Sequence, residues 1–262
     1  MTNSIEASDR AHDILAALRS STEQLGTLVA PLDDDALGHR AYPSEWSVAD
    51  VMSHIGSSAE IMQRRVDDAR LGQPTPDDFA PSVWDIWNAK SVRARADDGL
   101  RADRALIDAL DELAGAGGGA LEFAMGPMTF DFANFVGLRL NEQLLHTWDI
   151  DVSLDPSAAL PATGAAIAVD NVSLVGRYTA RPTGATRTIN ARTTNPTRSF
   201  TVALTPESVK YAVGDDEAEP DVTLPAEAWI RLVYGRLDAE HTPAFEGDVT
   251  ALETLRQVYP GP

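Results

Sequence analysis

The chain has 262 residues, 44% hydrophobic and 23% charged, which is the composition of a globular protein that buries a core. It has 21 basic and 40 acidic residues, and the resulting net charge of −19 argues against binding to nucleic acid or to anionic membranes. Without a membrane-length apolar run or a signal-peptide pattern, we expect a cytoplasmic protein with no membrane partner. Since cysteine is absent, metal ligands must be His, Asp or Glu, and any reactive thiol must come from outside.

Helical periodicity dominates the first 155 residues. A first helix is expected after a cap at Ser8, and a second starts at Ser47, where Ser47 and Asp50 form a capping-box pattern. Three prolines predict irregular structure over residues 72–81. Four successive amphipathic helices predict an antiparallel bundle. The apolar stripes of these helices cover residues 14–29, 48–66, 83–113 and 132–153, and glycines at 114–120 end the third.

The pattern changes after a linker-like segment at 155–164, which is followed by one more helix to about Tyr178. Short segments with strand chemistry then alternate with turns, which predicts an α+β domain with an antiparallel sheet. We therefore predict two domains, covering residues 1–157 and 158–262. The predicted strands are 186–194, 199–204, 209–213 and 222–224, and the predicted helices are 225–234 and 249–258.

Three residues suggest a metal site. Glu142 and His146 are four residues apart on a predicted helix, so their side chains leave the same face. His54 is next to Ile55 on the apolar stripe of another helix, so it should point into the bundle. Taken singly, Glu142 also fits a solvated helix face, and His54 fits a core-edge histidine bonded to a backbone carbonyl. Together, two imidazoles and one carboxylate form the His₂Glu set of catalytic zinc sites, and we predict a metal centre.

The segments WSVADVMSHIG (46–56) and NEQLLHTWDID (141–151) resemble the DinB-like superfamily and, more narrowly, the mycothiol-dependent maleylpyruvate isomerase family. The resemblance implies metal ligands at His54, Glu142 and His146, with Asp149 as the trailing acid of the motif. PDVTLPAEAWIRLVYGRLD (220–238) and FEGDVTALETLRQVYPG (245–261) are similar to a sterol-carrier-like domain. The expected fold is thus mainly α plus α+β, a DinB-like antiparallel four-helix bundle followed by a smaller α+β sterol-carrier-like domain.

For function, the resemblance implies a metal-dependent enzyme in which mycothiol attacks a small electrophile, as in the cis–trans isomerisation of maleylpyruvate. A metal-coordinated thiol is deprotonated, so a chain without cysteine can still deliver a thiolate. Zn²⁺ is the expected metal, although the same ligands accept Ni²⁺, Fe²⁺ or Co²⁺. Two alternatives stay open: mycothiol S-transfer to an electrophile, and a non-catalytic DinB-like binding or stress-response module. The sequence leaves the oligomeric state open.

Two further residues are candidate catalytic groups. Asp149 could orient His146 or act as a base, and a solvated acid is the alternative. Arg236 resembles an arginine that the family presents to a carboxylate substrate, and a surface arginine is the alternative. Asp50 could orient His54, but its capping role explains it equally well and is the interpretation we favour. The four tryptophans of the first domain are expected in the core: Trp46, Trp84, Trp87 and Trp148.

Overall fold

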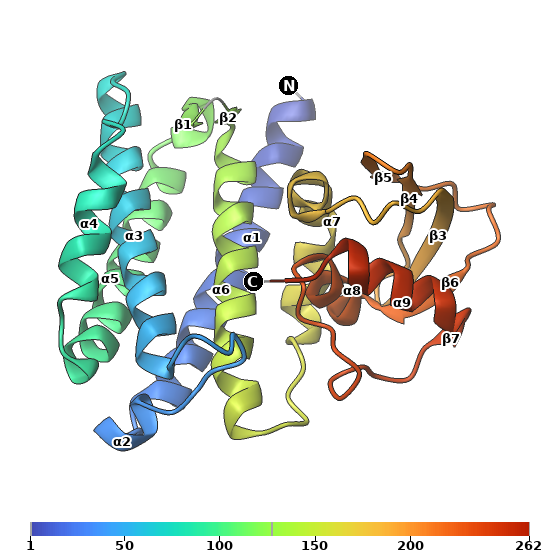
Figure 1. The fold of residues 1–262 in the computed structure, drawn as a ribbon. Helices are drawn as coiled ribbons and strands as arrows, with labels where there is room; N and C mark the ends of the chain where they lie inside the picture. The colour runs from blue at the N-terminus through green and yellow to red at the C-terminus, as the bar shows by residue number, and fades with distance from the viewer. Residues whose placement is uncertain (1, 127, 262) are drawn as a thin grey trace. The chain divides into compact units, whose positions relative to one another are not determined.

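Figure 1 shows the fold of the chain as a computed structural model, which describes residues 2–126 and 128–261. Contacts within the chain divide it into two compact units, Met1–Ala158 and Ala159–Pro262. The first unit is mainly helical, and the second combines helices with a five-stranded sheet. None of the described helices is both long enough and apolar enough to cross a membrane.

The first unit is an antiparallel bundle in which α1 packs mainly against α6, and α3 against α5 (Figure 1). Its long helices are α1 (Thr2–Val29), α3 (Val48–Leu71), α5 (Val92–Gly115) and α6 (Phe132–Leu154). Its shorter elements are α2 (Asp34–Leu37), α4 (Phe79–Asn88), the 3₁₀ turn η1 (Gly118–Ala120), β1 (Phe123–Met125) and β2 (Met128–Phe130).

One apolar cluster joins all four long helices. It contains Leu25 of α1, Val51 and Ile55 of α3, Leu100 of α5 and Ile150 of α6, each at most 8% exposed. Full burial of each such side chain contributes roughly 1.5–3 kcal/mol. Because His54 precedes Ile55, and Ile150 is on the helix that carries Glu142 and His146, this packing also fixes α3 against α6 near the candidate ligands.

The single helix predicted over 83–113 is wrong, because the structure has two helices there, α4 and α5. The Ser91 side chain accepts a hydrogen bond from the backbone N–H of Ala94 and so caps a new helix. The predicted irregular segment 72–81 is also too long, since α4 already begins at Phe79. Pro81 is tolerated there because the first-turn N–H groups of a helix have no intrahelical acceptor.

Two more local details differ from the sequence prediction. The helix α1 begins at Thr2, so Ser8 lies inside it rather than capping its start. The antiparallel hairpin of β1 and β2, which pairs Phe123 with Phe130, was not predicted. Its strands have only three residues each, too few to give a readable alternation. The hairpin is held to the bundle by Phe123, whose ring stacks on Phe135 at 4.2 Å between centroids.

The second unit begins with α7 (Ala162–Thr179), which is followed by a run of strands, a helix, a short further strand and a last helix. The strands are β3 (Arg187–Thr194), β4 (Ser199–Leu204), β5 (Val209–Val213), β6 (Val222–Pro225) and β7 (Glu246–Gly247), and the helices are α8 (Ala226–Val233) and α9 (Val249–Val258). Its core includes Trp229 of α8, which stacks on Phe200 of β4 at 5.2 Å and donates a hydrogen bond to the Tyr211 hydroxyl.

The sheet has the strand order β5-β4-β3-β6-β7 and is mixed. The pairs β5–β4, β4–β3 and β6–β7 are antiparallel, but β3 and β6 run parallel, with Ala191 opposite Val222. The prediction of an antiparallel sheet is therefore wrong for this pair. Strand chemistry identifies a strand, whereas the direction of its neighbour depends on how the chain returns to the sheet.

Candidate metal centre

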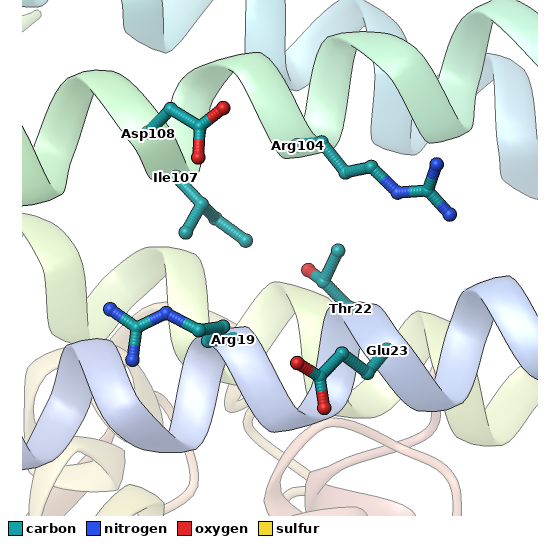
Figure 2. A pocket seen from close by; sticks show the side chains of 6 residues that line it. All are labelled: Arg19, Thr22, Glu23, Arg104, Ile107 and Asp108. Atoms are coloured by element: carbon teal, nitrogen blue, oxygen red, sulfur yellow. The ribbon is translucent and has the colours of Figure 1, made fainter.

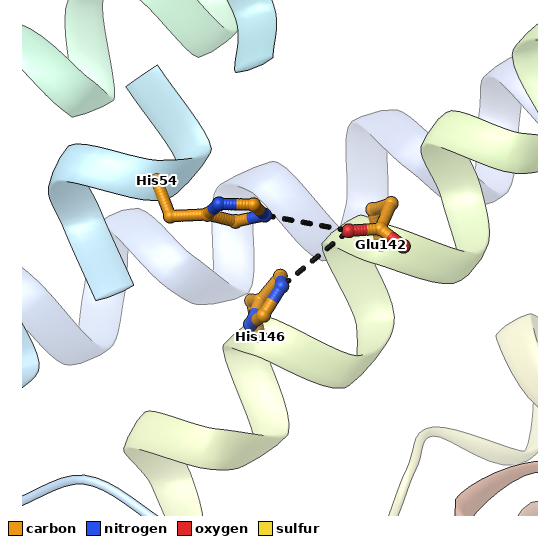
Figure 3. Close-up of side chains that lie close together, drawn as sticks. All are labelled: His54, Glu142 and His146. Atoms are coloured by element: carbon orange, nitrogen blue, oxygen red, sulfur yellow. Dashed lines mark hydrogen bonds and ion pairs between the residues drawn. The ribbon is translucent and has the colours of Figure 1, made fainter. Parts of the chain in front are cut away.

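Three candidate ligands converge between two helices of the bundle. Figure 3 shows His54 projecting from α3 toward Glu142 and His146 on α6. The Nε2 atoms of His54 and His146 each lie 3.4 Å from Oε2 of Glu142. One ligand atom from each of the three residues lies within 4.8 Å of the others. The structure therefore brings together the three residues that the sequence predicts as ligands.

Capping sets the position of His54 along α3. The Ser47 hydroxyl accepts a hydrogen bond from the Asp50 N–H, and the Asp50 carboxylate accepts one from the Ser47 N–H. This reciprocal pair fixes the first residue of the helix, and His54 follows two turns later. The expected capping role of Asp50 is confirmed, and its second carboxylate oxygen also pairs with Arg95 of α5.

On α6 the helical repeat places the other two residues. Asp131 caps this helix by accepting a hydrogen bond from the Asn134 N–H. Glu142 and His146 lie one turn apart on the face that points toward α3 (Figure 3). The imidazole of His146 is buried, whereas the Glu142 side chain is 43% exposed and that of His54 33%. Small molecules therefore have access to the point where the three side chains meet.

The two histidine-to-glutamate spacings suit a tetrahedral divalent ion. Two atoms that each bind Zn²⁺ at about 2.0–2.1 Å in a tetrahedron lie about 3.3–3.4 Å apart. Both histidine-to-glutamate distances are 3.4 Å. Two imidazole nitrogens and one carboxylate oxygen are the His₂Glu donor set of catalytic zinc sites, which keep a further position for water or substrate.

A second carboxylate fixes the orientation of His146. Nδ1 of His146 lies 2.9 Å from Oδ2 of Asp149, whose side chain is fully buried one turn further along α6. With Nδ1 turned to Asp149, Nε2 is the ring atom of His146 that faces Glu142, and loss of the Nε2 proton would free its lone pair for a metal. The backbone carbonyl of Asp149 accepts a hydrogen bond from the Tyr42 N–H, which ties the loop before α3 to this turn.

The protonation states at the centre also suit a metal. Burial alone would raise the pKa of Glu142, but hydrogen bonds and charge from His146 and His54 together hold its pKa well below the usual range. Burial lowers the pKa of His54 by more than its hydrogen bond to Glu142 raises it. An ionised carboxylate beside a neutral imidazole is the combination that binds divalent metals.

The sequence matches the family model of the mycothiol maleylpyruvate isomerase N-terminal domain over residues 18–151, which is more than half of the chain. The chain belongs to this family. No curated protein matches the sequence.

Two solved structures resemble this member of the maleylpyruvate isomerase family along most of its length. A crystal structure of the mycothiol-dependent maleylpyruvate isomerase has a TM-score of 0.65 at 14% identity, covering 91% of this chain and 94% of that one. A histidine-to-alanine mutant of the mycothiol-dependent maleylpyruvate isomerase gives a TM-score of 0.63 at 12% identity, covering 89% and 96%. At such identities the likeness establishes the fold, and it confirms the predicted bundle followed by an α+β domain.

In this family member a tryptophan covers both imidazoles, which the sequence did not reveal. The Trp46 ring lies 5.3 Å from the His54 ring and 6.0 Å from the His146 ring, measured between centroids. Trp46 was predicted to be a core residue, and it does pack half-buried against the bundle core. Its position directly before the helix cap is the sequence signal for its contact with the imidazoles, because residues at this position fold back over the first turns of the helix.

A buried polar network lies beneath the metal centre. Arg139 of α6 donates hydrogen bonds to Asp103 of α5 at 2.7 Å and to the Ile55 carbonyl of α3 at 3.3 Å. Asp103 also accepts bonds from Gln143 of α6 at 2.9 Å and from Thr22 of α1 at 2.7 Å. The network thus links all four long helices within a turn of the ligands. Charged residues on apolar stripes are the sequence signal for such a network, and the sequence analysis did not predict this one.

The other predicted residues have different surroundings. Arg236 is in the second unit, after α8, where it is 7% exposed and its guanidinium donates a hydrogen bond to the Tyr234 carbonyl. Its predicted role toward a substrate carboxylate stays a prediction. Trp87 and Trp148 are buried as expected, but the prediction of a core position is wrong for Trp84, which is 47% exposed on α4.

A small hollow of about 210 Å³ lies between α1 and α5, and none of the candidate ligands lines it (Figure 2). Side chains of both signs surround it, and Arg19 pairs with Asp111 at its edge at 2.6 Å. Mixed charges on facing helices are typical of solvated surface pairing, so we place the functional site at the metal centre. The lining residues are Arg19, Thr22, Glu23, Arg104, Ile107 and Asp108.

Proposed function

We propose that the chain is a metal-dependent enzyme that uses mycothiol to attack a small electrophile, with cis–trans isomerisation of maleylpyruvate as the reaction. The observation that carries the proposal is the convergence of His54, Glu142 and His146 in a chain that has no cysteine. Membership of the maleylpyruvate isomerase family supports the thiol and the reaction class. We place the reaction in the cytoplasm, where low-molecular-weight thiols are kept reduced.

His54, Glu142 and His146 would hold the cation, for which we propose Zn²⁺, while Ni²⁺, Fe²⁺ and Co²⁺ suit the same ligands. When bound, the cation supplies the positive charge that lowers the pKa of a thiol from about 8.5, so that the thiolate predominates at neutral pH. A cation held by these three residues would keep a position open to an exogenous ligand, and we propose that the thiol would bind there.

The surrounding residues position these ligands. We assign Asp149 the role of a positioning residue, because its buried carboxylate contacts Nδ1 of His146. The Trp46 ring lies against both imidazoles and limits how they can turn. Arg236 keeps its proposed role as the cation that pairs with a substrate carboxylate.

In the proposed isomerisation the thiolate sulfur donates an electron pair to one carbon of the cis double bond. The π electrons move onto the conjugated carbonyl oxygen, and the former double bond rotates as a single bond. When those electrons return, the carbon–carbon double bond re-forms as the trans isomer and the thiolate leaves unchanged. In the alternative S-transfer, the enolate takes up at its α-carbon the proton that the thiol lost, and the carbon–sulfur bond remains.

The test removes one ligand and measures metal and thiol dependence together. We expect His146→Ala to keep the helical fold, because alanine is a good helix former, while zinc binding and thiol-dependent turnover fall together. His12→Ala, which removes an exposed imidazole from α1, is the matched control and should keep both. Undiminished turnover by metal-free protein, or equal turnover without thiol, would refute the proposal. Thiol that is recovered after turnover indicates isomerisation, and thiol consumed in a thioether indicates S-transfer.

A further inference from the structure

The candidate metal centre lies across the boundary between two pairs of helices. In one pair α3 packs on α5, and Gly99 of α5 is so close to α3 that a Cβ added there would be 2.8 Å from the Met52 carbonyl oxygen. In the other pair α1 packs on α6. His54 belongs to the first pair, whereas Glu142 and His146 belong to the second (Figure 3). The ligand spacing therefore depends on how the two pairs are placed against each other.

The buried polar network crosses this boundary. Arg139 of α6 donates hydrogen bonds to the Asp103 carboxylate of α5 and to the Ile55 carbonyl of α3. The same carboxylate accepts hydrogen bonds from Gln143 of α6 and from Thr22 of α1. Each of the four side chains is at most 4% exposed. Because water has little access to compete for these bonds, they tie the α3–α5 pair to the α1–α6 pair in one register.

The network contacts the direct neighbours of two ligands. Ile55, whose carbonyl accepts from Arg139, follows His54 in α3. Gln143, whose amide oxygen lies 3.2 Å from the same guanidinium, follows Glu142 in α6. Both contacts are made by one nitrogen, Nη2. This nitrogen therefore connects the backbone beside one ligand with the side chain beside another.

Stability alone does not account for this network. An ion pair taken out of water loses about as much hydration as it gains in attraction, so an apolar pair of similar volume would stabilise the bundle equally well. Nε of Arg139 also has no hydrogen-bond partner among the described residues. Apolar contacts are non-directional, whereas a hydrogen bond requires a defined distance and angle. The network can therefore select one placement of the helix pairs, which an apolar core cannot do as sharply.

We propose that Arg139 and Asp103 are positioning residues of the metal centre, which hold the two helix pairs in the register that brings His54 to Glu142 and His146. The inference rests on the proposed function, because that function supplies the metal whose affinity depends on this register. Ligand geometry and fold stability should then be separable. Replacing the ion pair by apolar residues should keep the stability of the bundle and weaken the metal centre.

The test compares two variants of the full chain that should differ from the parent in opposite ways. Asp103→Leu combined with Arg139→Met removes the network and keeps the core filled. Leu110→Ala is the matched control, because Leu110 is 0% exposed two turns further along α5, outside the network, and its truncation leaves a cavity. Competition with a chelator measures zinc affinity, and urea unfolding measures stability. The visible absorption of bound Co²⁺ reports the arrangement of the ligands.

We expect the variant with both substitutions to bind zinc about tenfold more weakly than the parent, as for the loss of an outer partner of a metal ligand. Its Co²⁺ spectrum should change, while its urea midpoint stays close to that of the parent. Leu110→Ala should show the reverse, with a lower urea midpoint and parental zinc affinity and Co²⁺ spectrum. Parental metal binding in the folded variant with both substitutions would overturn the inference. Equal loss of affinity in Leu110→Ala would also overturn it, because affinity would then follow stability.

A second variant keeps the test decisive if the apolar pair does not fold. Arg139→Lys keeps a positive charge beside Asp103, but its ammonium ends about one bond short of Nη2 and cannot contact all three acceptors. Its zinc affinity should therefore also fall and its Co²⁺ spectrum change. Parental values for both would show that the charge, and not the hydrogen bonds, matters, and would overturn the inference.

Metal binding by the parent separates this inference from the proposed function. A parent chain that binds neither zinc nor cobalt would refute the metal centre, and the proposed function and this inference would fail together. A parent that binds both ions, with network variants that match it, would overturn the positioning role and leave the proposed function intact.

Discussion

The buried ion pair of Arg139 and Asp103 makes the bundle sensitive to a single substitution. Arg139 is 1% exposed and Asp103 is 0% exposed, and their nearest atoms are 2.7 Å apart. Asp103→Ala would leave a guanidinium in the core without its counter-charge, at a cost of about 3–5 kcal/mol. For a unit of this size, 1 kcal/mol corresponds to about 2–4 °C, so we expect the melting temperature to fall by about 6–20 °C.

Replacing both partners should behave differently. An ion pair exchanged for apolar residues of similar volume is neutral or stabilising by about 1–4 kcal/mol. Among the described residues Nε of Arg139 has no hydrogen-bond partner, so the charge is incompletely satisfied. Against this gain, the Gln143 amide and the Thr22 hydroxyl lose their acceptor on Asp103. The unsatisfied amide costs about 1–3 kcal/mol, whereas a threonine hydroxyl can turn to a backbone carbonyl of its own helix at little cost. The variant carrying both Asp103→Leu and Arg139→Met should therefore unfold within about 2 kcal/mol of the parent.

Urea unfolding followed by tryptophan fluorescence measures these differences. Trp46, Trp84, Trp87 and Trp148 belong to the first unit, so the signal reports mainly on the bundle. The two units can unfold separately. The slope of the unfolding free energy against urea concentration is therefore compared between variants, to verify that the same transition is followed. A variant with both substitutions that is no more stable than Asp103→Ala would refute the reasoning, because the loss would then not come from the unpaired charge.

Three further outcomes follow from single contacts. In Gly56→Ala the new Cβ would overlap the Trp87 ring, and we expect a loss of about 1–3 kcal/mol in urea unfolding, whereas unchanged stability would contradict this packing. Asp149→Asn should weaken zinc about 10–100-fold in a chelator competition while the fold remains, and unchanged affinity would exclude a positioning role. The Arg187 hydrogen bond, together with bonds from Thr250, lowers the pKa of Asp248 to about 2. The ionised Asp248 therefore stabilises the folded state fully above about pH 4, and this stabilisation is lost as the pH falls toward 2. The stability difference between the parent and Asp248→Asn should therefore shrink over that interval, and a difference that grows on acidification would contradict the sign.

Local chemistry explains which elements the sequence predicts well. The start of α3 follows from the pairing of Ser47 with Asp50, and β4, β5 and α9 have the predicted bounds because turn residues or a cap delimit each of them. The proximity of Glu142 and His146 follows from the helical repeat alone. These features depend on neighbours in sequence, so the sequence contains the information needed to predict them.

Features that depend on distant partners were harder to predict. The parallel pairing of β3 with β6 is decided by the path of the chain, and the Arg139–Asp103 pair joins residues 36 positions apart. The exposure of Trp84 depends on the break between α4 and α5. No glycine or proline lies at this break, so the sequence does not predict it. His54 is an intermediate case, because its place on the apolar stripe predicted its direction, while its grouping with Glu142 and His146 came from the chemistry of a His₂Glu ligand set and was then supported by the family resemblance.

All three candidate ligands and the network beneath them lie before residue 151, the residue at which the family match ends. The rest of the chain can therefore diverge among relatives without disturbing coordination chemistry. Selection can act on that portion of the gene while the ligand set is inherited unchanged in the other. Such a division lets relatives share one set of candidate ligands while the rest of their chains differ.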